Sequence, residues 1–359
     1  MAPGRIFLDA NGQLVVPDEP TIPVAVGDGA GEGSWRLARR LAEEAVARAF
    51  GGQRKAHFLE VPAGARAERA LNDRVPTSTV NAFRLYRVGL DGGQEPLASE
   101  QTTLQRELRS LLDLHVALVG LPGGPLVVFD QGEAGSAAVE LPAGSANALR
   151  FLGLVEASAP ALTGALRFGT VAAADRYHAE RRELEPGVVE ATVGLVPTSR
   201  LGVERLTVGA ARLARAQGRT RLTLVEPDTS PRLTFARRIA ARLSLQMLPP
   251  DERPALDQTR LVTVPARLES GKIECLVASE REGLELLGAL APRFGGRRAL
   301  ARGQYNLETG HAVFGPYSPD FDHVGPPLVE AIRLLFTHLG WTAAAQQLGG
   351  ATGAAGAAA

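Results

Sequence analysis

The feature that most constrains how this chain can fold is an alternation of short apolar runs with segments of helical periodicity. Short runs rich in β-branched residues are typical of strands, and apolar residues spaced three and four apart are typical of helices. The alternation predicts a layered α/β architecture with helices on both faces of a sheet. The expected strands are Ile22–Val26, His57–Val61, Leu114–Val119, Leu126–Phe129, Val189–Val196, Arg221–Val225, Leu261–Val264 and Ile273–Ala278, and the expected helices are Ser34–Phe50, Thr103–Leu112, Val203–Gln217 and Pro327–Leu339.

Two stretches depart from this alternation. Residues 132–187 are rich in Ala, Gly and Pro, and their weak periodicity is compatible with a hairpin, a dimerisation arm or a loop. Residues 349–359 contain only Gly, Ala and one Thr. Because such a segment has few apolar groups to offset the entropy of ordering it, we predict a disordered tail there.

Length and composition limit the class of protein. A chain of 359 residues predicts about two domains of roughly 150 residues each. The 39 basic and 39 acidic residues balance, which argues against a nucleic-acid or membrane-surface partner. The single cysteine, Cys275, excludes an intrachain disulfide framework and a cysteine-cluster zinc site. No secretory signal follows Met1, and no apolar run approaches the ~20 residues of a membrane span, so we expect a cytoplasmic protein.

A glycine-rich loop follows the first expected strand. It runs from Gly27 through Asp28 and Gly29 to Gly33, and such a loop allows close backbone approach to an anion. It lacks both the third glycine of a dinucleotide fingerprint and the Lys-Ser/Thr of a phosphate-binding loop. A tight turn is therefore the favoured interpretation, and an anion- or cofactor-binding loop stays open as the alternative.

Arginines around the second expected helix are a further candidate. Arg106 and Arg109 are three residues apart on that helix, with Arg84 and Arg87 upstream. Guanidinium groups at such spacing could form an anion pocket, but a solvated helix face gives the same pattern. The histidines have no metal-site spacing, and no nucleophile elbow occurs. Motifs alone therefore leave the function open.

Several segments together resemble the isocitrate and isopropylmalate dehydrogenase family of β-decarboxylating dehydrogenases, and bacterial isocitrate dehydrogenase in particular. The similarity is collinear over most of residues 20–348. The segments that carry it are Pro23–Glu32, Lys55–Gly64, Pro76–Gly89, Leu104–Leu118, Arg221–Arg238 and Pro326–Ala345, the last with His338-Leu-Gly-Trp intact.

The resemblance implies a fold and an assembly. The implied fold is a two-domain layered α/β protein without a Rossmann fingerprint. Residues 1–120 and 285–348 would form the large domain, and residues 121–284 the small domain with a dimer clasp within 132–187. The family's active site lies between the domains and uses NAD or NADP with Mg²⁺ or Mn²⁺.

Position by position, the resemblance places the family's substrate-helix residues on Thr103, Gln105 and Arg109. Only Arg109 retains the family residue; the other two positions differ from the Ser and Asn of the family pattern. The family's catalytic tyrosine and lysine positions are occupied by Ala137 and Pro227. Neither side chain can transfer a proton.

Other family positions have also changed. The two later substrate arginines fall on Val119 and Asp130, and a lysine position falls on Asp91. The two metal aspartates fall on Leu284 and Gly288.

The acidic candidates that remain for a metal are Asp251 and Asp257, and the cofactor candidates are Gly27, Asp28 and Gly29. We therefore expect no catalytic residues, no metal site of the family type and no bound cofactor.

Three functions follow as hypotheses. The first is a family member that has lost dehydrogenase chemistry and serves as a dimeric regulatory or structural partner. The second is a divergent NAD(P)- and metal-dependent dehydrogenase of a hydroxy di- or tricarboxylic acid. The third is an anion or nucleotide sensor that uses Gly27–Gly33 and Arg109.

We also expect a homodimer, or a heteromer with an active family member. The segments Val203–Gln217 and Arg232–Leu245 each carry small and apolar residues on one face. Two such helices from each subunit could form a four-helix interface with two-fold symmetry. The alternative is that both helices cover the sheet of their own chain.

Overall fold

The computed structural model describes residues 4–26, 30–92, 104–131, 141–142, 192–193, 200–226, 231–296, 300–317 and 325–355. The chain divides into two compact units, residues 1–134 with 199–359, and residues 135–198. In the second unit the described residues are β8 (Leu141–Pro142) and β9 (Thr192–Val193), which pair antiparallel. Most of the expected clasp and of the expected strand Val189–Val196 therefore lies outside the described residues.

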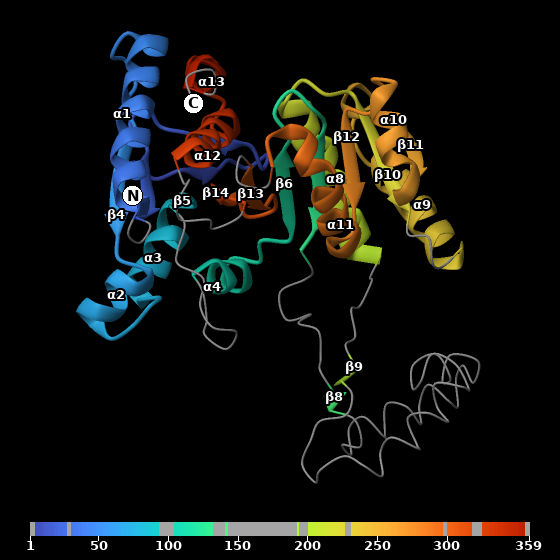
Figure 1. The fold of residues 1–359 in the computed structure, drawn as a ribbon, viewed down its shortest axis with the longest axis horizontal. Helices are drawn as coiled ribbons and strands as arrows, with labels where there is room; N and C mark the ends of the chain where they lie inside the picture. The colour runs from blue at the N-terminus through green and yellow to red at the C-terminus, as the bar shows by residue number, and fades with distance from the viewer. Residues whose placement is uncertain are drawn as a thin grey trace. The chain divides into compact units, whose positions relative to one another are not determined.

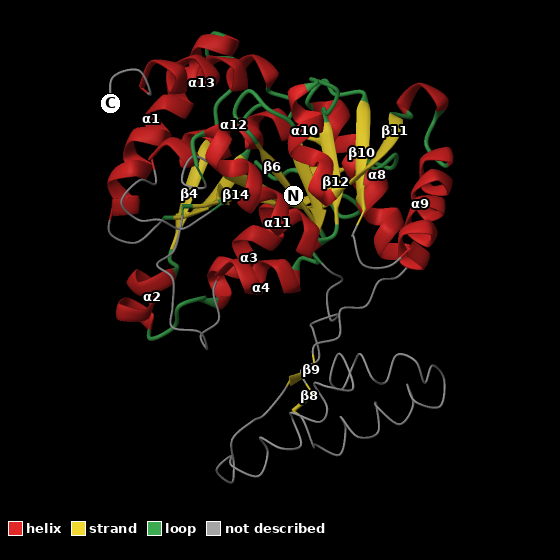
Figure 2. Ribbon diagram, turned by 45° about the vertical axis from the view of Figure 1, so that its right-hand side comes forward, coloured by secondary structure: helices red, strands yellow, loops and turns green. Residues whose placement is uncertain are grey.

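The first unit is built on a ten-stranded sheet with the order β11-β10-β12-β7-β6-β13-β14-β5-β3-β4 (Figures 1 and 2). Neighbours are parallel except at the centre, where β6 is antiparallel to both β7 and β13, and β13 is antiparallel to β14. A small hairpin of β1 (Phe7–Leu8) and β2 (Leu14–Val15) precedes the sheet. The strands are β3 (Thr21–Ala25), β4 (His57–Val61), β5 (Val88–Asp91), β6 (Val116–Gly120), β7 (Leu126–Asp130), β10 (Arg221–Glu226), β11 (Ala255–Arg260), β12 (Cys275–Ala278), β13 (Ala301–Asn306) and β14 (His311–Pro316).

Helices cover both faces of this sheet, which confirms the predicted layered α/β class (Figure 2). Several of the elements are joined by short 3-10 turns, which are η1 (Pro250–Glu252), η2 (Leu261–Thr263) and η3 (Ala291–Phe294). The helices are α1 (Ala30–Phe50), α2 (Gly64–Leu71), α3 (Thr77–Tyr86), α4 (Leu104–Leu111), α8 (Arg200–Ala216), α9 (Pro231–Gln246), α10 (Val264–Glu269), α11 (Glu280–Leu290), α12 (Gly325–His338) and α13 (Thr342–Ala355).

Alternation along the central strands divides the core between the two faces. Val116 and Leu118 of β6 pack with α1, α8 and α12, whereas Ala117 and Val119 face α10 and α11. Successive residues of a strand point to opposite faces, so a strand covered on both sides must be apolar throughout. This is why β6 and β12 are continuous apolar runs and are buried along their whole length.

The observed elements depart from the expected ones in three places. Leu261–Val264 is not a strand: Leu261–Thr263 forms the 3-10 turn η2, and α10 begins at Val264 with Pro265 in its first turn. The edge strand is the preceding β11, whose polar sequence gives no apolar signal. Strands β5, β13 and β14 had no counterpart among the strands expected from periodicity.

The carboxy-terminal segment is also different from the expectation. Helix α13 continues through residues 349–355, where composition predicts a disordered tail. Residues 342–348 already form the helix, and extending a helix is easier than starting one. Residues 356–359 lie outside the described residues. The domain boundaries at 120/121 and 284/285 stay a prediction, since the sheet takes strands from both sides of each. Within the described ranges, no helix combines the length and apolar character needed to cross a bilayer.

Candidate functional site

Helix α4 carries two of the predicted binding residues on a face separate from its buried face. Leu104, Leu108 and Leu112 are buried and pack with Phe83 and other residues of the α3–β3–β14 core. Gln105 and Arg109 are four residues apart, so they project from the same side of the helix, next to that apolar stripe. The amphipathic pattern of α4 therefore fixes where the two polar side chains can reach.

Arg109 forms a two-point ion pair with Glu280 of α11. Its Nη1 lies 2.9 Å from Glu280 Oε1, and its Nη2 lies 3.3 Å from Glu280 Oε2. Glu280 is in the first turn of α11, where a carboxylate also interacts favourably with the helix dipole. The guanidinium fork of Arg109 is thus already matched to a carboxylate of its own chain.

Gln105 bridges a buried acid and a guanidinium. Its Nε2 donates to Asp91 Oδ2 at 2.6 Å, and its Oε1 accepts from Nη2 of Arg302. Asp91 is only 1% exposed, at the end of β5. Both ends of the Gln105 amide are therefore used within the protein.

Polar residues on β13 complete this arrangement. Arg302, Gln304 and Asn306 alternate along the strand and so share one face, the face on which α4 lies. Asn306 Nδ2 donates to the carbonyl of Leu112 at 3.1 Å. With its amide oxygen toward Arg302, Gln304 accepts from the guanidinium at 2.9–3.3 Å. Hydrogen bonds from Arg302 and Asn306 of β13 therefore hold α4 and the residue after it against the sheet.

Burial and the nearby charge of Asp91 shift the pKa of Arg302 in opposite directions. Removal from water lowers the pKa of the Arg302 guanidinium, and the carboxylate of Asp91 raises it.

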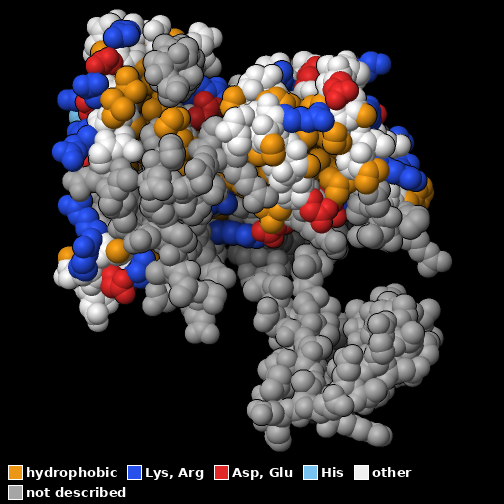
Figure 3. Space-filling view, in the orientation of Figure 1, with side chains coloured by type: hydrophobic (Ala, Val, Ile, Leu, Met, Phe, Trp, Pro, Cys, Tyr) orange, Lys and Arg blue, Asp and Glu red, His pale blue; other side chains and the backbone are white. Residues whose placement is uncertain are grey.

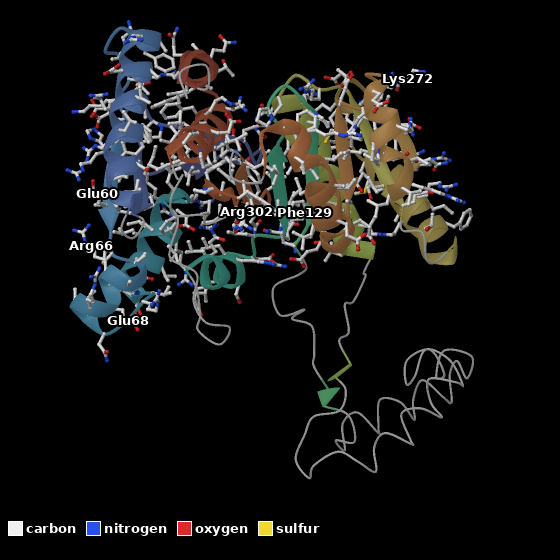
Figure 4. The ribbon with its side chains drawn as sticks, in the orientation of Figure 1. Glu60, Arg66, Glu68, Phe129, Lys272 and Arg302 are labelled. Carbon is white, nitrogen blue, oxygen red and sulfur yellow. The ribbon has the colours of Figure 1, made fainter. Side chains whose placement is uncertain are left out.

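Figure 4 places Arg302 at the centre of the view, apart from Glu60 and Glu68 on β4 and α2. In the space-filling view, basic and acidic side chains adjoin between α4 and α11 (Figure 3). The cluster of Asp91, Gln105, Arg109, Glu280 and Arg302 is called the α4 cluster below.

Several predicted site positions lie outside the described residues. These are Thr103, the loop Gly27, Asp28 and Gly29, and the family positions at Ala137 and Pro227. The side chain of Arg106 is likewise not described. The structure therefore brings together Gln105 and Arg109, and it does not test the cofactor-loop prediction.

The resemblance assigns the later substrate-arginine positions to Val119 and Asp130. Val119 is fully buried in the sheet and faces α11. Asp130 ends β7 and is only partly buried. A carboxylate at this position repels the carboxylate that an arginine would bind.

In the part of the chain that the structure describes, the two predicted metal candidates, Asp251 and Asp257, each lie beside an arginine. The Asp257 carboxylate is held by Arg267 and by the backbone N–H of Gln258. The Asp251 side chain is 78% exposed beside Arg215. Within the described ranges, no three His, Cys, Asp or Glu side chains are grouped to hold a metal.

Arg84 and Arg87 do not join the α4 cluster. Arg84 is exposed on α3, and Arg87 caps that helix and precedes β5 at the end opposite Asp91. Conversely, Glu280, Arg302 and Gln304 join the site without having been predicted. Each is far from α4 in sequence, and no local motif marks them.

The comparisons agree with this fold. No family model matches the chain. An isocitrate dehydrogenase [NADP] of Streptococcus mutans is 24% identical over 92% of this chain and 86% of its own length, and one of Staphylococcus aureus is 24% identical over 93% and 87%. Isocitrate dehydrogenase from Methylococcus capsulatus has a TM-score of 0.63 at 17% identity, covering 91% of this chain and 87% of that one. A β-decarboxylating dehydrogenase from Thermococcus kodakarensis has a TM-score of 0.60 at 16% identity, covering 89% and 83%.

The similarity over nearly the whole chain supports membership of the isocitrate/isopropylmalate dehydrogenase family. The matches to the sequence relatives run along nearly the whole chain rather than one motif. In the resemblance, Arg109 falls on the position of the substrate-helix arginine. In this isocitrate dehydrogenase-like protein, however, that arginine faces a carboxylate built into α11.

Proposed function

We propose that this isocitrate dehydrogenase-like protein has lost the family's dehydrogenase chemistry and acts as a non-catalytic dimeric partner, regulatory or structural. The observation that carries the proposal is the two-point pair between Arg109 and Glu280. A substrate carboxylate would have to displace Glu280 to reach the guanidinium. The neighbouring amide of Gln105 is likewise committed to Asp91 and Arg302.

Changed residue types support the same proposal. The family positions for proton transfer hold Ala137 and Pro227, and the metal positions hold Leu284 and Gly288. Proton transfer by a positioned side chain contributes roughly 10²–10⁴ in rate, and a metal adds further stabilisation of developing charge. Loss of both leaves negligible turnover. The proposal accordingly includes no resident NAD(P) and no resident metal.

The test is a dehydrogenase assay on homogeneous protein. Isocitrate and isopropylmalate would each be offered with NAD or NADP and with Mg²⁺ or Mn²⁺, and reduced nicotinamide would be followed by absorbance. We expect no rate above a protein-free blank, while an active family member assayed in parallel gives a clear rate. Robust metal-dependent turnover would refute the proposal.

A second candidate is a dehydrogenase with a rebuilt site for another hydroxy di- or tricarboxylic acid. It is favoured by the polar character of the α4 cluster, where two carboxylates and two guanidiniums meet instead of apolar side chains. The same assay with a panel of hydroxy acids separates the two candidates. Turnover that is lost in Arg109→Gln would establish the second.

The proposed assembly is a dimer in the cytoplasm formed through α9. The face of α8 once expected at an interface, with Leu206 and Ala210, instead packs against the chain's own sheet. Helix α9 presents a different, exposed stripe at four-residue spacing that runs on past its last turn. The exposed fractions are Phe235 61%, Ile239 41%, Leu243 48% and Met247 70%. Burial of this stripe against a second copy or a related subunit would remove that apolar area from water.

A further inference from the structure

A group of basic side chains gathers at the amino ends of β5 and β14, at the opposite end of β5 from Asp91. Arg87 directly precedes β5, His311 begins β14, and Arg84 is on the last turn of α3. Arg5 precedes the hairpin of β1 and β2. The four residues, called the basic cluster below, have no part in the α4 cluster.

Hydrogen bonds hold three of these residues to one another. Arg87 Nη1 donates to the carbonyl of Thr309, and the Thr309 hydroxyl lies 2.8 Å from His311 Nδ1. His311 Nε2 lies 3.2 Å from the carbonyl of Arg84 and therefore donates to it. With Nε2 protonated, neutral His311 accepts the Thr309 hydroxyl at Nδ1. Neutral His311 thus links Thr309 to the backbone of Arg84 without adding charge.

The amino-terminal hairpin brings Arg5 to the same place. It packs on the β13–β14 turn, where Gly310 adopts a φ of +74° and a Cβ would lie 2.9 Å from Leu8 Cδ2. Gly4 is fixed next to it, since its carbonyl accepts from Thr21 N at 2.8 Å. Arg5 is therefore held beside the turn that carries Thr309 and His311.

The basic cluster is short of negative charge. The Nε atoms of Arg5 and Arg87 are buried and have no hydrogen-bond partner. In the described part of the chain, neither guanidinium pairs with a carboxylate. Burial and the charge of Arg5 lower the pKa of Arg87, and burial with the charges of Arg87, Arg84 and Arg5 lowers the pKa of His311. Partly desolvated cations without a counter-ion are unfavourable.

We propose that the basic cluster of Arg5, Arg84, Arg87 and His311 is a binding site for the phosphate group of a small molecule. The guanidiniums of Arg5 and Arg87, whose buried Nε atoms have no partner, match the charge of a phosphate dianion, and their planar N–H groups suit its oxygens. A bound phosphate supplies acceptors for the unpaired donors and relieves the repulsion between Arg5 and Arg87. The basic cluster does not include Arg109, so phosphate binding there can be tested independently of the function proposed above.

The probe is inorganic phosphate, compared with chloride at matched ionic strength because salt screens charge. The readouts are the thermal unfolding midpoint and titration calorimetry. A ligand that binds only the folded state raises its stability, so we expect phosphate to raise the midpoint of the wild-type protein. The double variant Arg5→Gln/Arg84→Gln leaves the Arg87–Thr309 contact in place and should weaken phosphate binding at least tenfold.

Three controls make the result specific. Arg48→Gln removes an exposed arginine of α1 that pairs with Glu44, and it should bind phosphate as the wild type does. Arg109→Gln should also retain phosphate binding, which separates this site from the α4 cluster. Circular dichroism confirms that each variant is folded. No phosphate effect, an effect that survives in the double variant, or an equal effect of succinate would overturn the assignment.

Discussion

At the scale of single residues, the pair of Arg109 and Glu280 decides what can reach the α4 cluster. The two side chains are 36% and 41% exposed, so solvent screens their attraction and the pair contributes at most about 1 kcal/mol to folding. A carboxylate ligand competes with Glu280 for the same guanidinium fork. The pair therefore acts on ligand access more than on stability.

The variant Glu280→Gln should let a carboxylate ligand reach Arg109. Removal of the Glu280 charge leaves the Arg109 guanidinium without its carboxylate, so millimolar succinate should raise the unfolding midpoint of the variant and not of the wild type. The free energy of unfolding without ligand should change by less than about 1 kcal/mol. Glu43→Gln breaks a similarly exposed pair with Arg39 on α1 and serves as the matched control. An identical succinate response in wild type and Glu280→Gln would contradict the prediction.

At the scale of elements, α11 packs on β7 so closely that one position excludes a side chain. A Cβ on Gly283 would lie 2.6 Å from Cβ and Cγ of Phe129, atoms that cannot move without the strand. Packing against Phe129 is therefore sufficient reason for a glycine at position 283.

Gly283→Ala should therefore destabilise the protein. Overpacking costs roughly 1–3 kcal/mol, more than the helix propensity that alanine adds. Gly33→Ala in α1 is the control, because nothing lies within 4 Å of its Cβ position. That variant should be unchanged or stabilised by up to about 1 kcal/mol. Urea denaturation of both variants provides the comparison.

Helix α12 carries a histidine, His338, that is half-buried with a buried Nε2 and whose protonation opposes folding. His338 packs against Tyr305 and Phe314, with ring centroids 5.3 Å and 5.7 Å away, and its Nε2 has no hydrogen-bond partner. Burial lowers the pKa of His338 from 6.5 to about 4. Between these values the unfolded chain binds a proton that the native protein does not, so stability falls as the pH falls from 6.5 toward 4.

His338→Phe should remove this dependence. The expected difference in slope is about 1.4 kcal/mol per pH unit between pH 6.5 and pH 4, with no difference in slope above pH 6.5. Unfolding free energies measured by urea at several pH values give both slopes. Parallel curves for wild type and variant across this window would show that His338 titrates normally.

Some strands and site residues of this protein could be predicted from the sequence, and others could not. Strands β6, β7 and β12 were predictable because burial on both faces makes them continuously apolar. Strand β13 was missed because Arg302, Gln304 and Asn306 replace apolar residues on the face under α4. Gln105 and Arg109 were predicted from their positions in the resemblance. Their partners Asp91, Glu280 and Arg302 meet them only through long-range folding, which periodicity does not encode.

At the scale of the whole molecule, the exposed stripe on α9 predicts self-association. Light scattering at micromolar concentration should give roughly twice the 37.8 kDa mass of one chain. Phe235→Glu/Leu243→Glu places two charges on the stripe and should yield the single-chain mass with the fold retained. Leu37→Glu on α1 changes a leucine that is 47% exposed and should leave the mass unchanged. A single-chain mass for the wild type would refute the dimer and the partner role.

The position of β13 and β14 in the sheet determines the order in which the strands can pair during folding. These two late strands separate β6 from β5, so the earlier strands form two sheet segments with no hydrogen bonds between them until residues 301–316 arrive. During synthesis both β5 and β6 present open edges, and non-local pairing of this kind is intrinsically slow. Nascent chains that end before β13 should aggregate, whereas release of the full chain closes both edges at once.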